Sequence, residues 1–243
     1  METIRVLSTK KLLPEIVEEA KENGIEITEQ EAIAVHPILK EEKQEQLLSW
    51  FHRYTSQPIV FTSANAVSSL EHYLGKYLRG DKTRLQVFCL SGRTKEAVLE
   101  AFPIANIAGV APSARALAKL ILAKSINEVF FFCGNKRRDE LPGLLKQNGV
   151  VAHEIVVYET VPTPCIATEE MDAILFFSPS AADSFFSVNQ PKKNIICFAV
   201  GETTADSILK YSGNTIIISD TPSQEGMLKA LIAYKNLNTH PDN

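Results

Sequence analysis

The sequence predicts an α/β protein of two similar lobes, each built on a parallel sheet that helices cover. Short apolar runs alternate with amphipathic stretches along the chain, which is typical of strands followed by covering helices. Motifs at the ends of the apolar runs occur twice, which indicates an internal repeat. The length of 243 residues allows one large domain or two small ones.

Eight runs are rich in Val, Ile and Phe and do not alternate with polar residues. We therefore expect strands that are buried on both faces. They are Ile4–Ser8, Pro58–Thr62, Leu85–Leu90, Asn106–Val110, Glu128–Cys133, Ala173–Ser178, Asn194–Val200 and Thr215–Ser219. Between them, apolar residues at helical spacing predict amphipathic helices. The clearest sets are Leu12, Leu13, Ile16, Val17 and Ala20, then Leu117, Leu120 and Ile121, and finally Met227, Leu228, Leu231 and Ile232.

Two stretches break the alternation of strand and helix. Ile25–Ile38 and Val150–Pro164 are extended in character, partly alternating and rich in Pro at their ends. Each follows a predicted helix that stops at an Asn-Gly pair, a common helix-stop signal. We interpret these stretches as the two connections between the lobes, paired with each other as a two-stranded antiparallel ladder.

The motifs that follow the strands repeat in a fixed order. Three of them are FTSANAV, LSGRTKEA and APS, which return as FSPSAA, AVGETTA and TPS; they occupy 61–67, 90–97, 111–113, 177–182, 199–205 and 221–223. A fourth unit opens the chain at 8–14 and recurs at 133–142. The chain order is thus one unit, three units, one unit and three units.

This order predicts that one lobe is inserted into the other. The inserted lobe would take 41–149, and the discontinuous lobe would combine 1–24 with 166–243. The interlobe linkers would be 25–40 and 150–165. Both lobes would have a flavodoxin-like parallel sheet.

Composition excludes several classes of protein. The 25 Lys and Arg against 29 Asp and Glu give a net charge of −4 without a basic cluster, which argues against a nucleic-acid partner. No apolar run approaches the ~18 residues of a membrane span, and residues 1–5 lack a secretion-signal pattern. Three of the 4 Cys lie in apolar runs, as expected of buried thiols in a reducing compartment. We expect a cytoplasmic monomer with no membrane partner.

Hydroxyls and glycines gather at the predicted strand-to-helix junctions, where open α/β sheets bind ligands. The candidate binding residues there are Thr62, Ser63, Asn65, Gly92, Thr94, Ser178, Ser180, Gly201, Thr203 and Thr204. Each hydroxyl could also be an ordinary helix cap, and that alternative stays open. Together they predict an interlobe cleft whose donors suit carboxylates or phosphates.

Familiar catalytic signatures are absent from the sequence. It has no GxGxxG, GxxxxGK[ST] or GxSxG motif, and its His and Cys residues lack metal-ligand spacing. We expect neither a cofactor nor a metal ion.

Basic side chains follow two of the predicted strands, at Lys10–Lys11 and at Lys136–Arg138. Tyr158 lies on the second connection between the lobes. Its hydroxyl could reach the cleft, or its ring could pack within the ladder.

These motifs, in this order and spacing, resemble the uroporphyrinogen-III synthase family over essentially the whole chain. The resemblance rests on FTSANAV, on Cys133-Gly134-Asn135 with Arg138, on VYET at 157–160, and on FSPSA and AVGETTA in the second half. The resemblance implies two α/β lobes joined by a two-stranded ladder. It also implies a cofactor-free lyase in heme biosynthesis.

The implied reaction converts hydroxymethylbilane, a linear tetrapyrrole with eight carboxylates, to uroporphyrinogen III. Water is lost, ring D is inverted through a spiro intermediate, and the macrocycle closes. By resemblance Tyr158 assists departure of the hydroxyl, and Lys10, Gly134 and Arg138 join the substrate-binding residues. The enzyme that produces hydroxymethylbilane is an expected partner.

The sequence departs from the family pattern at two positions. Lys10 stands where the family often has Arg, so a bidentate grip on a carboxylate is lost. Lys95 stands where the family's Gly-x-x-Thr motif has Thr, whereas Thr204 matches in the other lobe. Two other classes are alternatives: a non-catalytic bilobed binding module for an anionic small molecule, and a two-lobe transferase that uses a nucleotide sugar.

Overall fold

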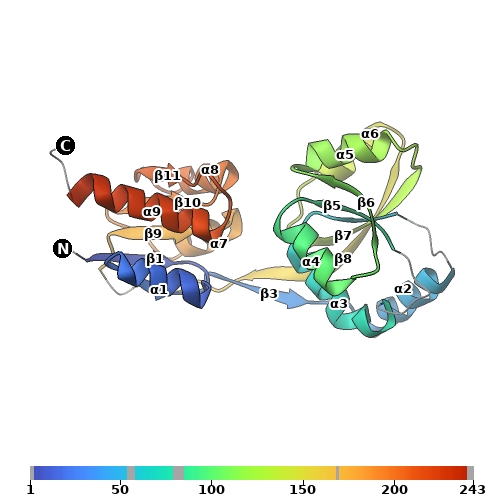
Figure 1. Ribbon diagram of the computed structural model, residues 1–243, viewed down its shortest axis with the longest axis horizontal. Coiled ribbons are helices and arrows are strands. Elements are labelled where there is room, and N and C mark those ends of the chain that lie inside the picture. Colours follow the sequence, from blue (N-terminus) through green and yellow to red (C-terminus); the bar gives the residue numbers. More distant parts are fainter. Residues whose placement is uncertain (1–2, 54–57, 79–84, 168–169, 240–243) are drawn as a thin grey trace. The chain divides into compact units, whose positions relative to one another are not determined.

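The chain folds into two units, and one of them is assembled from two separated segments. The computed structural model describes residues 3–53, 58–78, 85–167 and 170–239 (Figure 1). Met1–Ala34 and Val161–Asn243 form the discontinuous lobe, and Val35–Thr160 form the inserted lobe.

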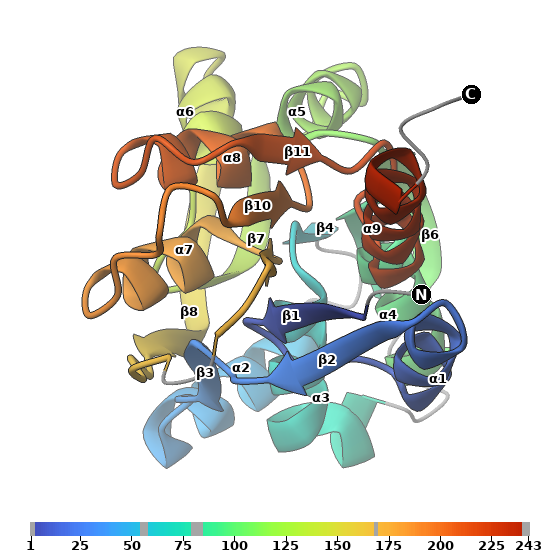
Figure 2. The same cartoon turned by 90° about the vertical axis from the view of Figure 1, so that its left-hand side faces the viewer.

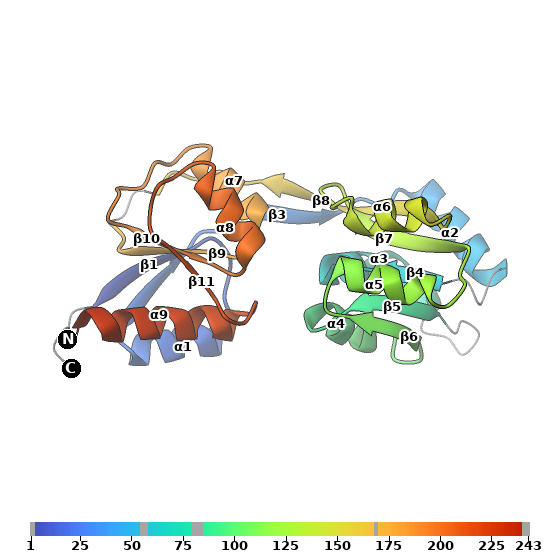
Figure 3. The same cartoon turned by 90° about the horizontal axis from the view of Figure 1, so that it is seen from above.

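The discontinuous lobe has a five-stranded sheet in the order β11-β10-β9-β1-β2, with parallel pairing throughout. Its strands are β1 (Ile4–Ser8), β2 (Ile25–Glu29), β9 (Ala173–Phe176), β10 (Ile196–Ala199) and β11 (Ile216–Ile218). Its helices are α1 (Pro14–Glu22), α7 (Pro179–Phe186), α8 (Glu202–Leu209) and α9 (Gln224–Thr239). Helices α1 and α9 cover one face of the sheet, and α7 and α8 cover the other (Figures 2 and 3).

The inserted lobe has a six-stranded sheet in the order β3-β8-β7-β4-β5-β6. Its strands are β3 (Ile33–Pro37), β4 (Pro58–Phe61), β5 (Gln86–Leu90), β6 (Asn106–Ala111), β7 (Glu128–Gly134) and β8 (Val151–Pro162). Its helices are α2 (Glu41–Arg53), α3 (Ala64–Leu78), α4 (Arg93–Ala101), α5 (Ala114–Leu122) and α6 (Glu140–Gln147). The central strand β4 is buried along its whole length, as its unbroken apolar run predicts.

The two sheets share one strand order, which confirms the internal repeat. Reading β2-β1-β9-β10-β11 in one lobe and β8-β7-β4-β5-β6 in the other places the repeated motifs at matching strand ends. All eight strands expected from apolar runs are present, with ends within two residues of those expected.

An antiparallel strand pair links the lobes. Ile38 N donates to Val157 O at 3.1 Å, and Thr163 N donates to Ala32 O at 2.9 Å. Residue numbers therefore rise in opposite directions along the two strands, β3 and β8. The link is shorter than the two extended stretches that the sequence suggested. Strand β2 pairs in parallel with β1, and most of β8 pairs in parallel with β7, so both join the sheets of their lobes.

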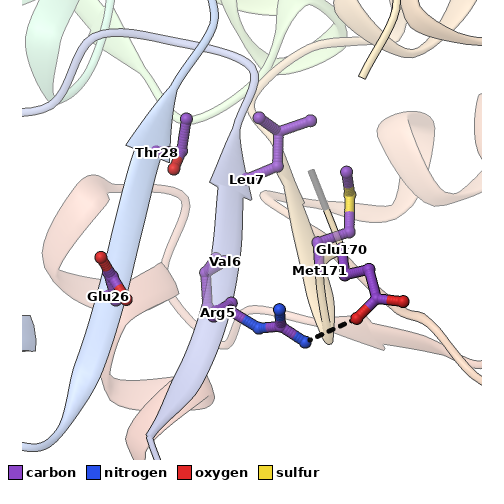
Figure 4. A pocket seen from close by; sticks show the side chains of 7 residues that line it. All are labelled: Arg5, Val6, Leu7, Glu26, Thr28, Glu170 and Met171. Carbon is purple, nitrogen blue, oxygen red and sulfur yellow. Dashed lines mark ion pairs between the residues drawn. The ribbon is translucent and has the colours of Figure 1, made fainter. Parts of the chain in front are cut away.

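The lobes differ in one covering helix. In the inserted lobe the chain before β4 forms α2, and the ring of Trp50 packs on Phe130 of β7, with centroids 3.8 Å apart. In the discontinuous lobe, the described residues between β8 and β9 contain no helix. A hollow of about 320 Å³ lies there instead, lined partly by Arg5 and Leu7 of β1 and Glu26 and Thr28 of β2 (Figure 4).

Within the described ranges, no helix combines the length and the apolar composition that crossing a bilayer requires.

Candidate functional site

The predicted binding residues lie at the carboxyl ends of the strands within each lobe. Parallel strands end at one edge of a sheet, so residues after different strands come together there. In the inserted lobe this edge carries Thr62, Ser63 and Asn65 after β4, Gly92 and Thr94 after β5, and Gly134 and Arg138 at the end of β7. In the discontinuous lobe it carries Lys10 after β1, Ser178 and Ser180 after β9, and Gly201, Thr203 and Thr204 after β10.

Tyr158 lies at this edge of the inserted lobe, in contact with residues from two other strands. Its hydroxyl donates a hydrogen bond to Ser63 Oγ at 3.2 Å. Its ring packs directly over the α-carbon of Gly134, the residue opposite it on β7. The structure therefore brings together three residues that are far apart in the sequence.

The environment of Tyr158 favours its protonated form. Burial is the largest effect and raises the pKa of the phenol above its ordinary value. The hydrogen bond with Ser63 lowers the pKa, and the charge that Cys133 carries when ionised raises it. Burial also raises the pKa of the Cys133 thiol to about 11, which keeps it neutral near pH 7. The phenol of Tyr158 is therefore protonated at neutral pH and has a proton that it can donate.

Asn135 holds the backbone around Tyr158, and our sequence analysis did not include it among the site residues. Its N–H donates to the carbonyl of Tyr158 at 3.1 Å, and its Oδ1 accepts from the N–H of Thr160 at 2.9 Å. An Asn that directly follows a strand-ending Gly was the available signal, because such residues commonly bond to nearby backbone.

Several of the predicted junction hydroxyls cap helices. Ser178 Oγ accepts from Ala181 N at 3.1 Å, and Ser63 Oγ accepts from Asn65 N at 3.2 Å. Capping uses the oxygen as an acceptor and leaves the hydroxyl proton available to another group. A cap can therefore also donate to a ligand at the helix N-terminus. Thr62 and Ser180 are half-buried at the same junctions.

The threonines after β5 and β10 differ in exposure. Thr94 and Thr204 are 7% and 1% exposed, so their side chains lie beneath the surface of their lobes. Thr203 is exposed beside Thr204, and Lys95 is exposed beside Thr94. Gly92 and Gly201 lie at the turns between these strands and the helices that follow them. Gly92 has a φ of +67°, which favours glycine, whereas the extended Gly201 does not require it.

The cations after β1 and β7 are held in different ways. The Lys10 ammonium lies 5.8 Å from the centre of the Phe177 ring, a cation–π contact at the end of β9. Arg137 is paired with Asp139 and Glu154 of its own lobe, and these partners raise its pKa. Arg138 is exposed beside it. Arg137 is therefore held within its own lobe by carboxylates.

Two hollows of the discontinuous lobe are lined by residues other than the predicted donors. Besides the one in Figure 4, a hollow of about 560 Å³ is lined by Arg5, Asp172, Phe185 and Asn189 among others. Arg5 stands near the start of β1 and Asp172 just before β9, so this second hollow lies near the amino ends of the strands, whereas the one in Figure 4 runs along β1 and β2 from Arg5 to Leu7 and from Glu26 to Thr28. The predicted donors do not line them. Among the described residues, no group of three His, Cys, Asp or Glu side chains could hold a metal ion.

A family comparison matches this arrangement. The sequence model described as "Uroporphyrinogen-III synthase HemD" matches residues 14–229. The chain belongs to the uroporphyrinogen-III synthase family. Members of this family are cyclising lyases of tetrapyrrole biosynthesis. No curated protein matches the sequence.

Solved structures of uroporphyrinogen-III synthases share the fold. A mutant enzyme from Thermus thermophilus is 17% identical, with a TM-score of 0.66 over 98% of this chain and 99% of that one. The enzyme from Helicobacter pylori is 18% identical, with a TM-score of 0.64 over 96% of this chain and 100% of that one. These identities are too low to transfer residue roles, so the structural likeness establishes the fold alone.

Proposed function

We propose that this chain closes hydroxymethylbilane into uroporphyrinogen III, with Tyr158 as the proton donor. The observation that carries the proposal is the hydrogen bond between the Tyr158 phenol and Ser63, at the strand-end edge where the family motifs gather. Family membership supplies the reaction, and the geometry supplies the residue.

The first step breaks the bond between the terminal methylene carbon and its hydroxyl oxygen. Tyr158 gives its proton to that oxygen, which leaves as water, and the electron pair of the pyrrole nitrogen stabilises the cation as an azafulvenium. A positioned acid accelerates such a step by about 10²–10⁴-fold. A donor that is fully protonated at neutral pH suits this step.

The second step is a problem of position. The azafulvenium is reactive enough to cyclise unaided to the wrong isomer, so the protein must direct the attack to the substituted α-carbon of ring D. The spiro intermediate then fragments and recloses with ring D inverted, and a final proton loss restores the pyrrole. Because the cyclisation is already intramolecular, holding its two ends in a near-attack geometry acts by restricting conformations and by selecting which carbon attacks.

The substrate's eight carboxylates are bound, in this proposal, by donors at the strand ends. Backbone N–H groups at helix N-termini, the hydroxyls of Ser178 and Thr203, and the cations of Lys10 and Arg138 have the chemistry required. With a net charge of −4, the chain does not attract a polyanion at long range, so these local donors must supply the affinity.

An isomer assay tests the proposal. Hydroxymethylbilane is generated in situ, the protein is added, the products are oxidised, and uroporphyrins I and III are separated. We expect isomer III to dominate with the native chain, and Tyr158→Phe to lower turnover far more than affinity. If isomer I alone forms, the synthase proposal is wrong. If Tyr158→Phe turns over at the native rate, only the proton-donor role is wrong.

Two further parts of the proposal concern the setting of the reaction. We place the chain in the cytoplasm, because its cysteines are free and three of them are buried in apolar cores.

We also propose that the enzyme producing hydroxymethylbilane acts as a partner, since the linear substrate cyclises unaided. A yield of isomer III that rises when the two proteins are mixed at constant flux would support direct transfer. A yield independent of mixing would refute it.

A further inference from the structure

Strand β8 contains one extra residue beside the end of β7. Cys133 pairs with Val156, but the next residue of β7, Gly134, pairs with Tyr158. Val157 is the inserted residue, and it is fully buried in the apolar core. A bulge of this kind re-aims the side chain that follows it. It places the Tyr158 ring opposite a residue that has no side chain.

The absence of a side chain at Gly134 is required by the ring. A β-carbon at position 134 would lie 2.5 Å from Tyr158 Cε2 and 2.8 Å from its hydroxyl oxygen. These distances are well inside van der Waals contact, so the ring would have to move. Gly134 has no positive φ, so close approach of the ring, not backbone conformation, is what requires a glycine.

Ser63 determines the position of the hydroxyl end of the ring. Its Oγ accepts one hydrogen bond from Tyr158 and one from Asn65 N, which occupies both lone pairs of the oxygen. The backbone donor at the start of α3 therefore fixes Oγ, and Oγ in turn fixes the phenol. A rotation of the serine hydroxyl about its C–O bond would direct its proton to the phenolate once Tyr158 has lost its own.

We propose that Gly134 and Ser63 are positioning residues, which act on the reaction through Tyr158 by seating its ring and its hydroxyl. The inference deepens the proposed function and rests on it only for its effect on turnover. In the proton-transfer step the phenol O–H bond breaks and a bond to the leaving oxygen forms. The serine O–H bond stays intact and only changes its acceptor.

The groups that act on the phenol come from three elements. Cys133 of β7 raises the pKa of Tyr158, and Ser63, after β4, lowers it. Glu154 of β8 and Arg137, after β7, act on Cys133, and these two are paired with each other. Loss of the serine hydrogen bond therefore raises the pKa of the phenol, since that bond is the contribution that lowers it.

We call Gly134 and Ser63 together the seat of Tyr158. A titration of the Tyr158 phenol tests the seat without any substrate. The ultraviolet phenolate signal of Tyr158 is taken as the difference between a protein and its Tyr158→Phe counterpart. We expect Ser63→Ala to shift the titration midpoint upward, because it removes the hydrogen bond that lowers the pKa of the phenol. We expect Gly134→Ala to shift the midpoint as well, because displacing the ring changes both this hydrogen bond and the burial of the phenol. We expect Ser63→Thr, which keeps the hydroxyl, to restore the native midpoint.

Gly109→Ala is the matched control in the same lobe. A β-carbon there would meet Leu120 and, at 2.8 Å, Cδ1 of Phe88, so it is equally crowded but far from the seat. We expect it to lower the melting temperature and leave the Tyr158 titration unchanged. An unchanged midpoint in both Gly134→Ala and Ser63→Ala would overturn the proposal. So would an equal shift in Gly109→Ala.

Kinetics separate this proposal from the proposed function. A displacement of about 1 Å in a reacting group can cost about 10²-fold in rate, so Gly134→Ala should lower kcat by about 10–100-fold with little change in KM. In a Tyr158→Phe background, neither seat variant should lower kcat further, since both act through the phenol. Additive losses there would overturn the positioning role. A shifted titration with native kcat would show that the seat exists and that Tyr158 is not the proton donor.

Discussion

Lys235 on α9 reaches across the discontinuous lobe to the end of α1, where its ammonium donates to Gly24 O at 3.0 Å and also to Asn23 O. The side chain is only 4% exposed, although it is charged. The carbonyls at a helix C-terminus carry partial negative charge and have no partner within the helix. Lys235 therefore satisfies the end of α1 from a helix more than 200 residues later in the chain.

Removing this ammonium should destabilise the discontinuous lobe. We expect Lys235→Met to lower the free energy of unfolding by about 1.5–3 kcal/mol, because buried carbonyls lose a charged donor. Urea denaturation followed by circular dichroism measures the change. Lys229→Met, at an exposed position of the same helix, is the control and should change stability little. Equal stability of the two variants would show that the contact contributes nothing.

The pH profile of turnover should reflect the raised pKa of Tyr158. An acid must be protonated to act, and a pKa raised above the ordinary ~10 keeps it protonated over a wider range. We expect kcat to be independent of this group up to about pH 10 and to fall only in stronger alkali. The raised pKa also stabilises the fold below pH ~10, and this contribution is lost as the pH rises through the folded-state value. The Tyr158→Phe variant should lack the alkaline decline in rate.

Two glycines permit a matched test of backbone strain. A β-carbon at Gly92 or at Gly143 would have open space around it, so neither substitution by Ala creates a clash. Gly92 has a φ of +67°, and Gly143 lies within α6. We expect Gly92→Ala to destabilise by about 1–2 kcal/mol and Gly143→Ala to stabilise by about 0.5–1 kcal/mol. Thermal denaturation of both variants measures the change in melting temperature. Shifts of the same sign in the two variants would contradict the strain argument.

Lys10 should contribute to substrate affinity more than to chemistry. We expect Lys10→Gln to raise KM by about tenfold, in line with a charged hydrogen bond of about 1.5 kcal/mol, and to leave kcat nearly unchanged. The loss should shrink at high salt, since the side chain is only half-buried. Lys11→Gln, at the adjacent exposed position, is the control. A fall in kcat with native KM would assign Lys10 a different role.

The strands and the repeat could be predicted because burial on two faces leaves a plain trace in the sequence. Runs such as Ile59, Val60 and Phe61 are fully buried, and nothing but an apolar strand is stable in that place. The division between the lobes was harder to predict. β2 is an edge strand with polar residues on one side, so its alternation looked like a connection rather than part of a sheet.

The positions of the candidate site residues at strand ends could be predicted, and their geometry could not. The hydroxyls at strand ends could be named from the sequence, because parallel sheets gather them at one edge. Their burial could not, since Thr94 and Thr204 depend on how each helix turns at its first residue. The contact between Tyr158 and Gly134 depends on an extra residue in β8, and a one-residue change of register leaves no signal in composition or periodicity.

The division of the chain also has a consequence for the order of events on the ribosome. The 126 residues from Val35 to Thr160 form a continuous lobe and can fold as soon as they emerge. The first 34 residues cannot complete their sheet until β9 has been made, because β9 is the inner neighbour of β1. At about 5–20 residues per second, Val6 and Leu7 wait roughly 8–33 seconds for that partner. During synthesis the nascent N-terminus is therefore the segment that a chaperone would meet unfolded.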